Sequence, residues 1–152
     1  MSRVVKVYKL GLISFNNALK IQYNIAQTHF KGMKEKKNNS SDTLLLLEHR
    51  PVYTVGIRRK EYAETEEKLK NLGADFVQTD RGGLITFHGP GQLVAYPIIN
   101  LKGYRPSMKW YVCQLEQCVI NLCKKLNITA TTSPHTGVWV GEDKIAAIGI
   151  RM

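Results

Sequence analysis

Long apolar runs are absent from this 152-residue sequence. No stretch approaches the about 20 residues that a membrane-spanning helix needs, so we expect no membrane span. Apolar residues nevertheless make up 43% of the chain, which is typical of a globular protein that buries its own core. We therefore predict a single domain over residues 1–152.

Cysteine is scarce, and its number is odd. Cys113, Cys118 and Cys123 stand five residues apart, and no two have the spacing of a zinc-binding pair. We therefore expect no metal site and no disulfide framework, and a reducing environment. On a helix, the three are expected to be partly buried residues of the helix face.

Acidic residues are few, with 12 Asp and Glu against 22 Lys and Arg, and none occurs between Met1 and Lys34. A net charge of +10 favours acidic partners: nucleic acid, an anionic membrane or an acidic carrier protein. A solvated basic face is the simpler reading. No zinc finger or RNA-recognition motif is present, so nucleic-acid binding is not expected. The N-terminal bias is shared by transit peptides, and it is equally compatible with the first strand and helix of the domain.

The apolar pattern predicts an α/β domain with a mostly antiparallel or mixed sheet and flanking helices. Helices are expected at 14–30, beginning at Ser14, at 61–72, ending at Gly73, and at 107–126. Strands are expected at 4–10, 43–49, 51–57, 76–79, 84–87 and 92–101, with a hairpin at 136–150 and an exposed polar loop at 34–42. The buried face of the first long helix should hold Phe15, Ala18, Leu19, Ile25 and Ala26, and that of the last Val112, Leu115, Val119, Leu122 and Leu126.

The segment RGGLITFHGPGQL, residues 81–93, has unusually few side chains. Glycines at 82–83 and 89–91 allow positive φ and a close approach of backbone to a ligand, although two β-turns around a short strand would need the same residues. Arg81, Thr86, His88 and Gln92 add a cation, a hydroxyl, an imidazole and an amide, which is typical of a site for a polar head beside a narrow slot. No phosphate-binding glycine pattern occurs here.

Three segments resemble successive motifs of the lipoyl(octanoyl) transferases: EHRPVYTVG at 48–56, RGGLITFHGPGQL at 81–93 and TGVWVGEDKIAAIGI at 136–150. The resemblance implies a fold related to the biotin and lipoate protein ligases. It implies transfer of an octanoyl group from octanoyl-acyl carrier protein to a lysine of the lipoyl domains of 2-oxoacid dehydrogenases and of the glycine-cleavage H protein, without a cofactor. It further implies a monomer of the mitochondrial type, or otherwise a cytoplasmic enzyme.

The resemblance also assigns residues. Substrate-binding positions fall on Arg81, Gly82, Gly83, Leu84, Ile85, Thr86, Phe87 and His88, and on Ala147, Ile148 and Gly149. A slot that buries six methylenes of an octanoyl chain would gain about 5 kcal/mol. Lys144 matches the lysine that lowers the pKa of the nucleophilic cysteine, since an ammonium stabilises the thiolate that attacks a thioester. We expect a structural role for His49 at the edge of the site.

The family's nucleophilic cysteine belongs to a Pro-Cys-Gly-like motif after KIAAIGI, and the 152 residues do not contain that motif. None of the three cysteines is expected to replace it. The expectation is therefore an octanoyltransferase domain whose C-terminal part is missing. Two alternatives stay open: a non-catalytic relative that only binds the acyl group or its carrier, and a lipoate or biotin ligase relative, for which the sequence gives no adenylate-binding signal.

Overall fold

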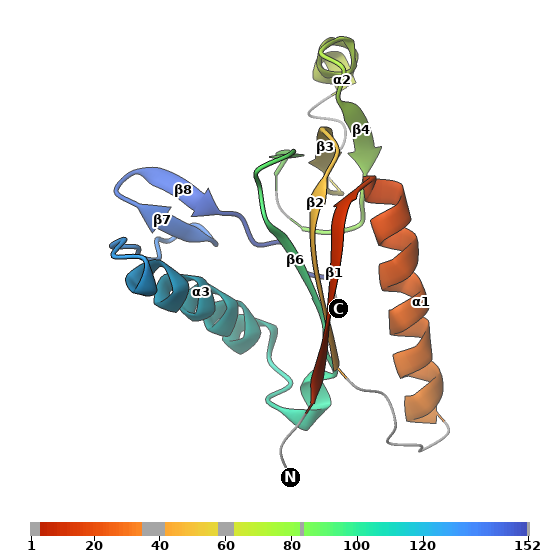
Figure 1. Ribbon diagram of the computed structural model, residues 1–152, viewed down its shortest axis with the longest axis vertical. Coiled ribbons are helices and arrows are strands. Elements are labelled where there is room, and N and C mark those ends of the chain that lie inside the picture. The colour runs from red at the N-terminus through yellow and green to blue at the C-terminus, as the bar shows by residue number, and fades with distance from the viewer. Residues whose placement is uncertain (1–3, 35–41, 58–62, 83, 152) are drawn as a thin grey trace. The chain divides into compact units, whose positions relative to one another are not determined.

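The computed structural model describes residues 4–34, 42–57, 63–82 and 84–151 (Figure 1). Its elements divide into two compact units, Met1–Asn100 and Leu101–Met152. The division into units does not test the expected single domain over residues 1–152, which stays a prediction. The polar loop expected at 34–42 lies almost entirely outside the described residues.

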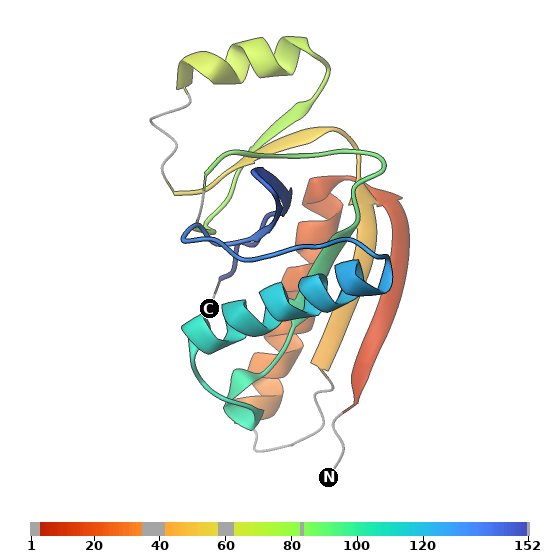
Figure 2. The same ribbon diagram turned by 90° about the vertical axis from the view of Figure 1, so that its left-hand side faces the viewer.

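The first sheet of the first unit has the strand order β1-β2-β6. β1 (Val5–Ile13) leads into α1 (Phe15–Lys34), and the chain returns as β2 (Asp42–His49), parallel to β1. β6 (Val94–Ile98) pairs antiparallel with β2, and its Pro97 is tolerated because β6 is an edge strand. α1 runs along one face of this sheet (Figure 2).

The second sheet has the order β4-β3-β5. β3 (Val52–Val55) pairs in parallel with β4 (Asp75–Gln78), which follows α2 (Ala63–Asn71), and antiparallel with β5 (Thr86–His88). Both sheets therefore mix parallel and antiparallel pairs, as predicted. Gly73 ends α2 with φ +80°, which confirms its predicted role as a C-terminal cap.

The second unit contains a 3₁₀ turn, η2 (Leu101–Gly103), then α3 (Met108–Lys125) and the hairpin β7 (Val138–Val140) and β8 (Asp143–Ala146). Ser107 caps α3, its hydroxyl accepting from the Trp110 N–H. The predicted turn between the two strands is present, and its Gly141 has φ +59°. Expected buried positions Leu122 and Leu126 are instead exposed, since within the described part of this unit only a two-stranded hairpin is available to cover the helix.

The core of the first unit lies between α1 and the first sheet. Ala18 of α1, Leu45 and Leu47 of β2, and Val94 of β6 are buried together. The partly buried residues packed around them are Leu10, Ile13, Ile21, Ile25, Tyr96 and Ile98. Leu44 and Leu46 point to the other face of β2 and are half-buried, so that face is covered in part, whereas the continuous apolar run predicts full cover on both faces. No helix among the described residues is long and apolar enough to cross a membrane.

Leu45 is 1% exposed, and Leu45→Ala should lower the free energy of unfolding by about 3 kcal/mol because it leaves a cavity in this core. Leu72 is 75% exposed, so Leu72→Ala serves as the matched control and should change stability by less than about 0.5 kcal/mol. Urea denaturation followed by circular dichroism measures both. Equal losses for the two variants would contradict the assigned core.

Candidate functional site

The residues assigned from the sequence fall into both units. Those of segment 81–88 occupy the loop after β4 and strand β5 in the first unit, with Gly83 outside the described residues. Lys144 lies on β8 in the second unit, and Ala147, Ile148 and Gly149 follow that strand without regular secondary structure. The assigned residues thus form one cluster within each unit.

Arg81 braces the loop that begins the first cluster. One terminal nitrogen of its guanidinium donates to the Gly82 carbonyl at 2.9 Å and to the Leu84 carbonyl at 3.1 Å. The other donates to the carbonyl of Thr54 at 2.9 Å and to its hydroxyl at 2.7 Å. Thr54 is fully buried on β3, and its hydroxyl donates in turn to the Thr86 carbonyl at 3.4 Å. Arg81 therefore fixes the backbone of the loop, in addition to any contact with substrate.

The bend after β5 is fixed by Glu48 at the end of β2. Its carboxylate accepts a 2.7 Å hydrogen bond from the Gly91 N–H, and Gly91 has φ +85°, which favours glycine. Gly89 lacks room for a side chain, because an added Cβ would lie 2.9 Å from the Phe87 ring. Gly82 does not have the positive φ that the sequence allowed, and the space around its Cβ position is open. Positive φ is thus used in the second bend of this segment, at Gly91.

His49 is fully buried and bonded at both ring nitrogens. Nδ1 lies 3.0 Å from the Ile13 carbonyl and Nε2 2.8 Å from the Tyr96 hydroxyl. A carbonyl only accepts, so Nδ1 carries the hydrogen and Nε2 accepts from Tyr96. Burial lowers the pKa of His49, and burial likewise raises the pKa of Tyr96 to about 12. His49 is therefore a neutral, fixed imidazole, which fits its expected structural role.

His88 stands edge-on to His49, with ring centroids 5.8 Å apart and an interplanar angle of 82°. Burial, with smaller contributions from His49 and the Arg81 charge, lowers the pKa of His88 to about 4. The ring is therefore neutral at pH 7. Its Nδ1 is buried without a hydrogen-bond partner in the described part of the chain, which is costly, and a hydrogen-bonding group of a ligand would relieve that cost.

Lys144 belongs to the second cluster, together with residues 147–149. Its side chain is exposed, and its Nζ donates to the Thr136 carbonyl at 3.1 Å. The ammonium is therefore held close to the start of the hairpin that carries it.

The cysteines all lie on α3. Cys123 is buried, whereas Cys113 and Cys118 are exposed, so the expectation of partial burial is wrong for those two. Their spacing of five residues turns them to different sides of the helix. Within the described ranges, no group of three His, Cys, Asp or Glu residues is arranged to hold a metal ion.

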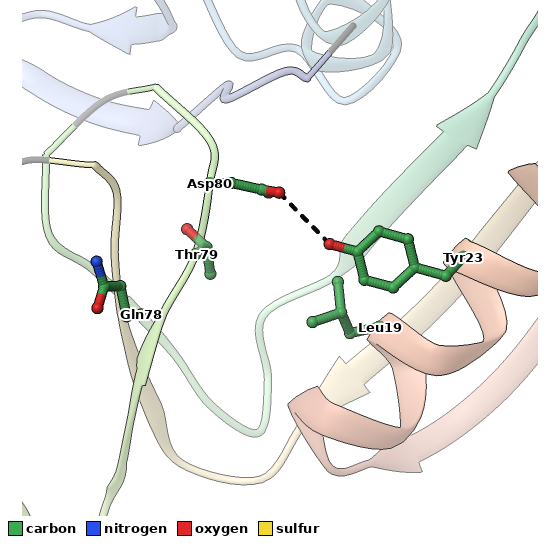
Figure 3. Close-up of a pocket in the computed structure, with 5 residues that line it drawn as sticks. All are labelled: Leu19, Tyr23, Gln78, Thr79 and Asp80. Carbon is green, nitrogen blue, oxygen red and sulfur yellow. Dashed lines mark hydrogen bonds between the residues drawn. The ribbon is translucent and has the colours of Figure 1, made fainter.

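A pocket of about 290 Å³ opens in the first unit (Figure 3). Leu19 and Tyr23 of α1 line one side, and Gln78, Thr79 and Asp80, from β4 and the loop that leads to Arg81, line the other. The Tyr23 hydroxyl donates to Asp80 over 3.5 Å, a long hydrogen bond. This lining is as polar as it is apolar, and so does not match the apolar slot expected for an alkyl chain.

Sequence reasoning missed the residues that support the cluster in the first unit, namely Glu48, Thr54 and Tyr96. Glu48 and Thr54 lie inside the quoted segment EHRPVYTVG, so their presence in that motif was an available signal. Tyr96 lies in a strand read only for its apolar pattern. Its polar role depends on a contact 47 residues away in sequence.

The fold is that of the lipoate protein ligases. A solved structure of lipoate-protein ligase A bound with ATP aligns with a TM-score of 0.61 and 16% identity, covering 95% of this chain and 59% of the other. A bi-partite lipoate protein ligase from Thermoplasma acidophilum, described with its E2 lipoyl domain, aligns with a TM-score of 0.62 and 13% identity, covering 93% and 52%. At such low identity the likeness shows the fold alone.

Residues 18–152 match the family model of the lipoyl protein ligase A/B catalytic domain, so the chain belongs to that family. It is 57% identical over 147 residues to a mitochondrial octanoyl-[acyl-carrier-protein]:protein N-octanoyltransferase of Danio rerio, covering 96% of this chain and 64% of the relative. A protein of the same name from Xenopus tropicalis is 49% identical, with coverages of 97% and 61%. An octanoyltransferase of Alkaliphilus metalliredigens is 41% identical, with coverages of 96% and 66%. The chain thus spans somewhat under two thirds of the length of these animal relatives.

Replacing Arg81 with lysine should destabilise the first unit by about 1–3 kcal/mol, because a lysine cannot make the forked bonds to Thr54 and the loop carbonyls. Arg50→Lys is the matched control, since the Arg50 side chain is exposed. Urea denaturation compares the two. An Arg81→Lys variant as stable as Arg50→Lys would show that Arg81 does not brace the loop.

Stability should also depend on pH through His88. Its folded pKa of about 4 lies below the ordinary value of 6.5, so the unfolded chain binds more protons between these values and stability falls as pH falls through that window. Allowing for partial solvent exposure, His88 should contribute about 1 kcal/mol of loss between pH 7 and 4.5. Denaturation at both pH values should show a smaller loss for His88→Asn than for the unchanged chain.

The control for that measurement is His135→Asn, because the His135 side chain is exposed. It should keep the pH dependence of the unchanged chain. A His88→Asn variant with the same dependence would contradict a half-buried, neutral His88.

Proposed function

We propose that this chain takes part in octanoyl transfer: it binds the octanoyl group of octanoyl-acyl carrier protein for delivery to a lysine of a lipoyl domain. The observation that carries the proposal is the 57% identity, over 96% of the chain, to a relative named as that transferase. All three motifs quoted from the sequence lie within residues 18–152, the part of the chain that matches the family model.

The reaction needs two acyl transfers. A cysteine thiolate attacks the carrier's thioester carbonyl, an enzyme thioester forms and the carrier thiolate leaves as a thiol after protonation. The lysine amine of the acceptor then attacks the enzyme thioester, so that an amide forms, the amine loses a proton and the cysteine thiol is restored. The energy of the thioester suffices for both steps, so we propose no nucleotide or metal cofactor.

In the first unit, segment 81–88 is the proposed acyl-binding segment. The open space at Gly82 is compatible with an alkyl chain that passes close to the backbone. Arg81 holds the loop in place through its bonds to the Gly82 and Leu84 carbonyls. The neutral His88 is proposed to offer its unpaired Nδ1 to a polar group of the substrate. Leu84 and Phe87 are exposed apolar side chains of the same segment and could contact the alkyl chain.

In the second unit, Lys144 is the proposed partner of the reacting thiolate, and residues 147–149 are a second substrate contact. An ammonium near a thiol favours the thiolate form. Because Lys144 is exposed and anchored to Thr136, its charge is both accessible and localised.

The proposed partners follow from charge and from the family. A net charge of +10 suits an acidic acyl carrier protein as donor. Lipoyl domains of 2-oxoacid dehydrogenases and the glycine-cleavage H protein are the proposed acceptors, and a related solved ligase is described with an E2 lipoyl domain. A mitochondrial location is proposed because the animal relatives are named mitochondrial.

The proposal is tested with the chain itself and with a chimera in which the remaining part of the Danio rerio relative follows residue 152. Each is incubated with octanoyl-acyl carrier protein, and intact mass spectrometry looks for an octanoyl adduct that hydroxylamine removes. We expect an adduct on the chimera and its transfer to an added lipoyl domain. An adduct on Cys113, Cys118 or Cys123 would instead place the nucleophile on α3. Absence of transfer by the chimera would refute the proposal.

Lys144→Ala in the chimera should slow adduct formation about tenfold at neutral pH, the effect of a thiol pKa one unit higher. Lys125→Ala removes another exposed charge, from α3, and should leave the rate unchanged. Rates are measured over pH 6–9, since a loss that disappears at high pH identifies a change in the thiol. Equal rates for the two variants would remove Lys144 from the mechanism.

A further inference from the structure

Lys144 faces an aromatic ring across the hairpin. Trp139 of β7 and Lys144 of β8 are directly paired, and the Lys144 Nζ lies 4.8 Å from the centroid of the Trp139 ring. A cation at this distance over an indole face is attracted by the ring quadrupole. The ammonium is thus held by two contacts, the indole face and the Thr136 carbonyl at 3.1 Å.

The indole ring is itself fixed. Its Nε1 donates to the His135 carbonyl at 3.2 Å. The backbone of Trp139 exchanges hydrogen bonds with Thr131, at 2.8 and 2.9 Å. Because both the backbone and the far end of the side chain are bonded, Trp139 offers a rigid surface to a side chain that would otherwise sample many rotamers.

The lysine stem passes over Gly137, where only glycine fits. An added Cβ would lie 2.5 Å from the Ala146 carbonyl oxygen and 3.3 Å from Cδ and Cε of Lys144, and Gly137 has φ +130°. The Gly137 N–H donates to the carboxylate of Glu116 at 2.9 Å, and Glu116 is buried on α3. The path of the lysine is therefore set by the hairpin and tied to the helix.

We propose that Trp139 is a positioning residue that holds the Lys144 ammonium at a fixed place for the reacting sulfur, an inference that rests on the proposed transfer function. An ammonium carries three N–H donors, and the bond to Thr136 leaves two for a thiolate. Trp139 is half-buried, so part of its side chain packs within the unit. The geometry gives its ring a second role, in aiming the charge.

The direct test is the NMR signal of the Lys144 ε-methylene in the chain labelled with ¹³C-lysine, assigned by its loss in Lys144→Arg. An indole face at this distance should move that signal upfield of the exposed Lys125. Trp139→Leu should return it to the position of Lys125, and Trp139→Phe should keep most of the shift, since the ring face remains although the bond to His135 is lost. A Lys144 signal that coincides with that of Lys125 in the unchanged chain would overturn the contact without any variant.

The kinetic test uses the chimera with the Danio rerio segment. Trp139→Leu should lower kcat for octanoyl transfer about two- to fivefold, the range of an exposed cation–π contact, with KM for the carrier protein unchanged. Trp139→Phe should recover most of that loss, which a merely structural indole contact to His135 would not allow. Transfer by Trp139→Leu at the unchanged rate would overturn the positioning role.

The two proposals fail in different ways. If Lys144→Ala transfers at the unchanged rate while the NMR shift is present, the role of the lysine in transfer is wrong and the contact with Trp139 stands. If Lys144→Ala is slow but Trp139→Leu and Trp139→Phe are both as fast as the unchanged chimera, the transfer function stands and the positioning role of Trp139 is refuted.

Discussion

The antiparallel pairing of β3 with β5 connects two of the three sequence motifs, and both of these lie in the first unit. Thr54 lies opposite Thr86 in that register, and its buried hydroxyl both accepts from Arg81 and donates to Thr86. A charged side chain can bond to several backbone groups at once only where the fold holds those groups in place. The loop of segment 81–84 therefore depends on β3, which the sequence shows only as a short run of apolar and β-branched residues.

Much of the fold follows from local pattern. The helix and strand positions and the glycine cap at Gly73 rest on periodicity and on the special backbone of glycine, which act over a few residues. The failures have a different cause. Leu122 and Leu126 fit an apolar stripe, but periodicity reports which face could be buried and not whether anything covers it.

The support of the candidate site could not be read from the sequence. His49 bonds to groups 36 and 47 residues away, and Glu48 bonds to Gly91 from a distance of 43. Such contacts arise only once the two sheets exist, so no local rule predicts them. A glycine at 91 could be recognised as a bend, whereas the carboxylate that fixes the bend could not.

Both clusters use backbone carbonyls to hold a cation. Carbonyls of Thr54, Gly82 and Leu84 accept from Arg81, and the carbonyl of Thr136 accepts from Lys144. The difference lies in how much of each donor set is used. Both terminal nitrogens of Arg81 make two hydrogen bonds each, one pair to the loop carbonyls and the other to Thr54. Among the described residues, Lys144 makes one hydrogen bond, to the Thr136 carbonyl, and otherwise contacts the face of the Trp139 ring. A cation that is oriented by an aromatic face makes few hydrogen bonds and keeps a donor for a further partner, which supports our proposal that Lys144, and not Arg81, acts on the reacting group.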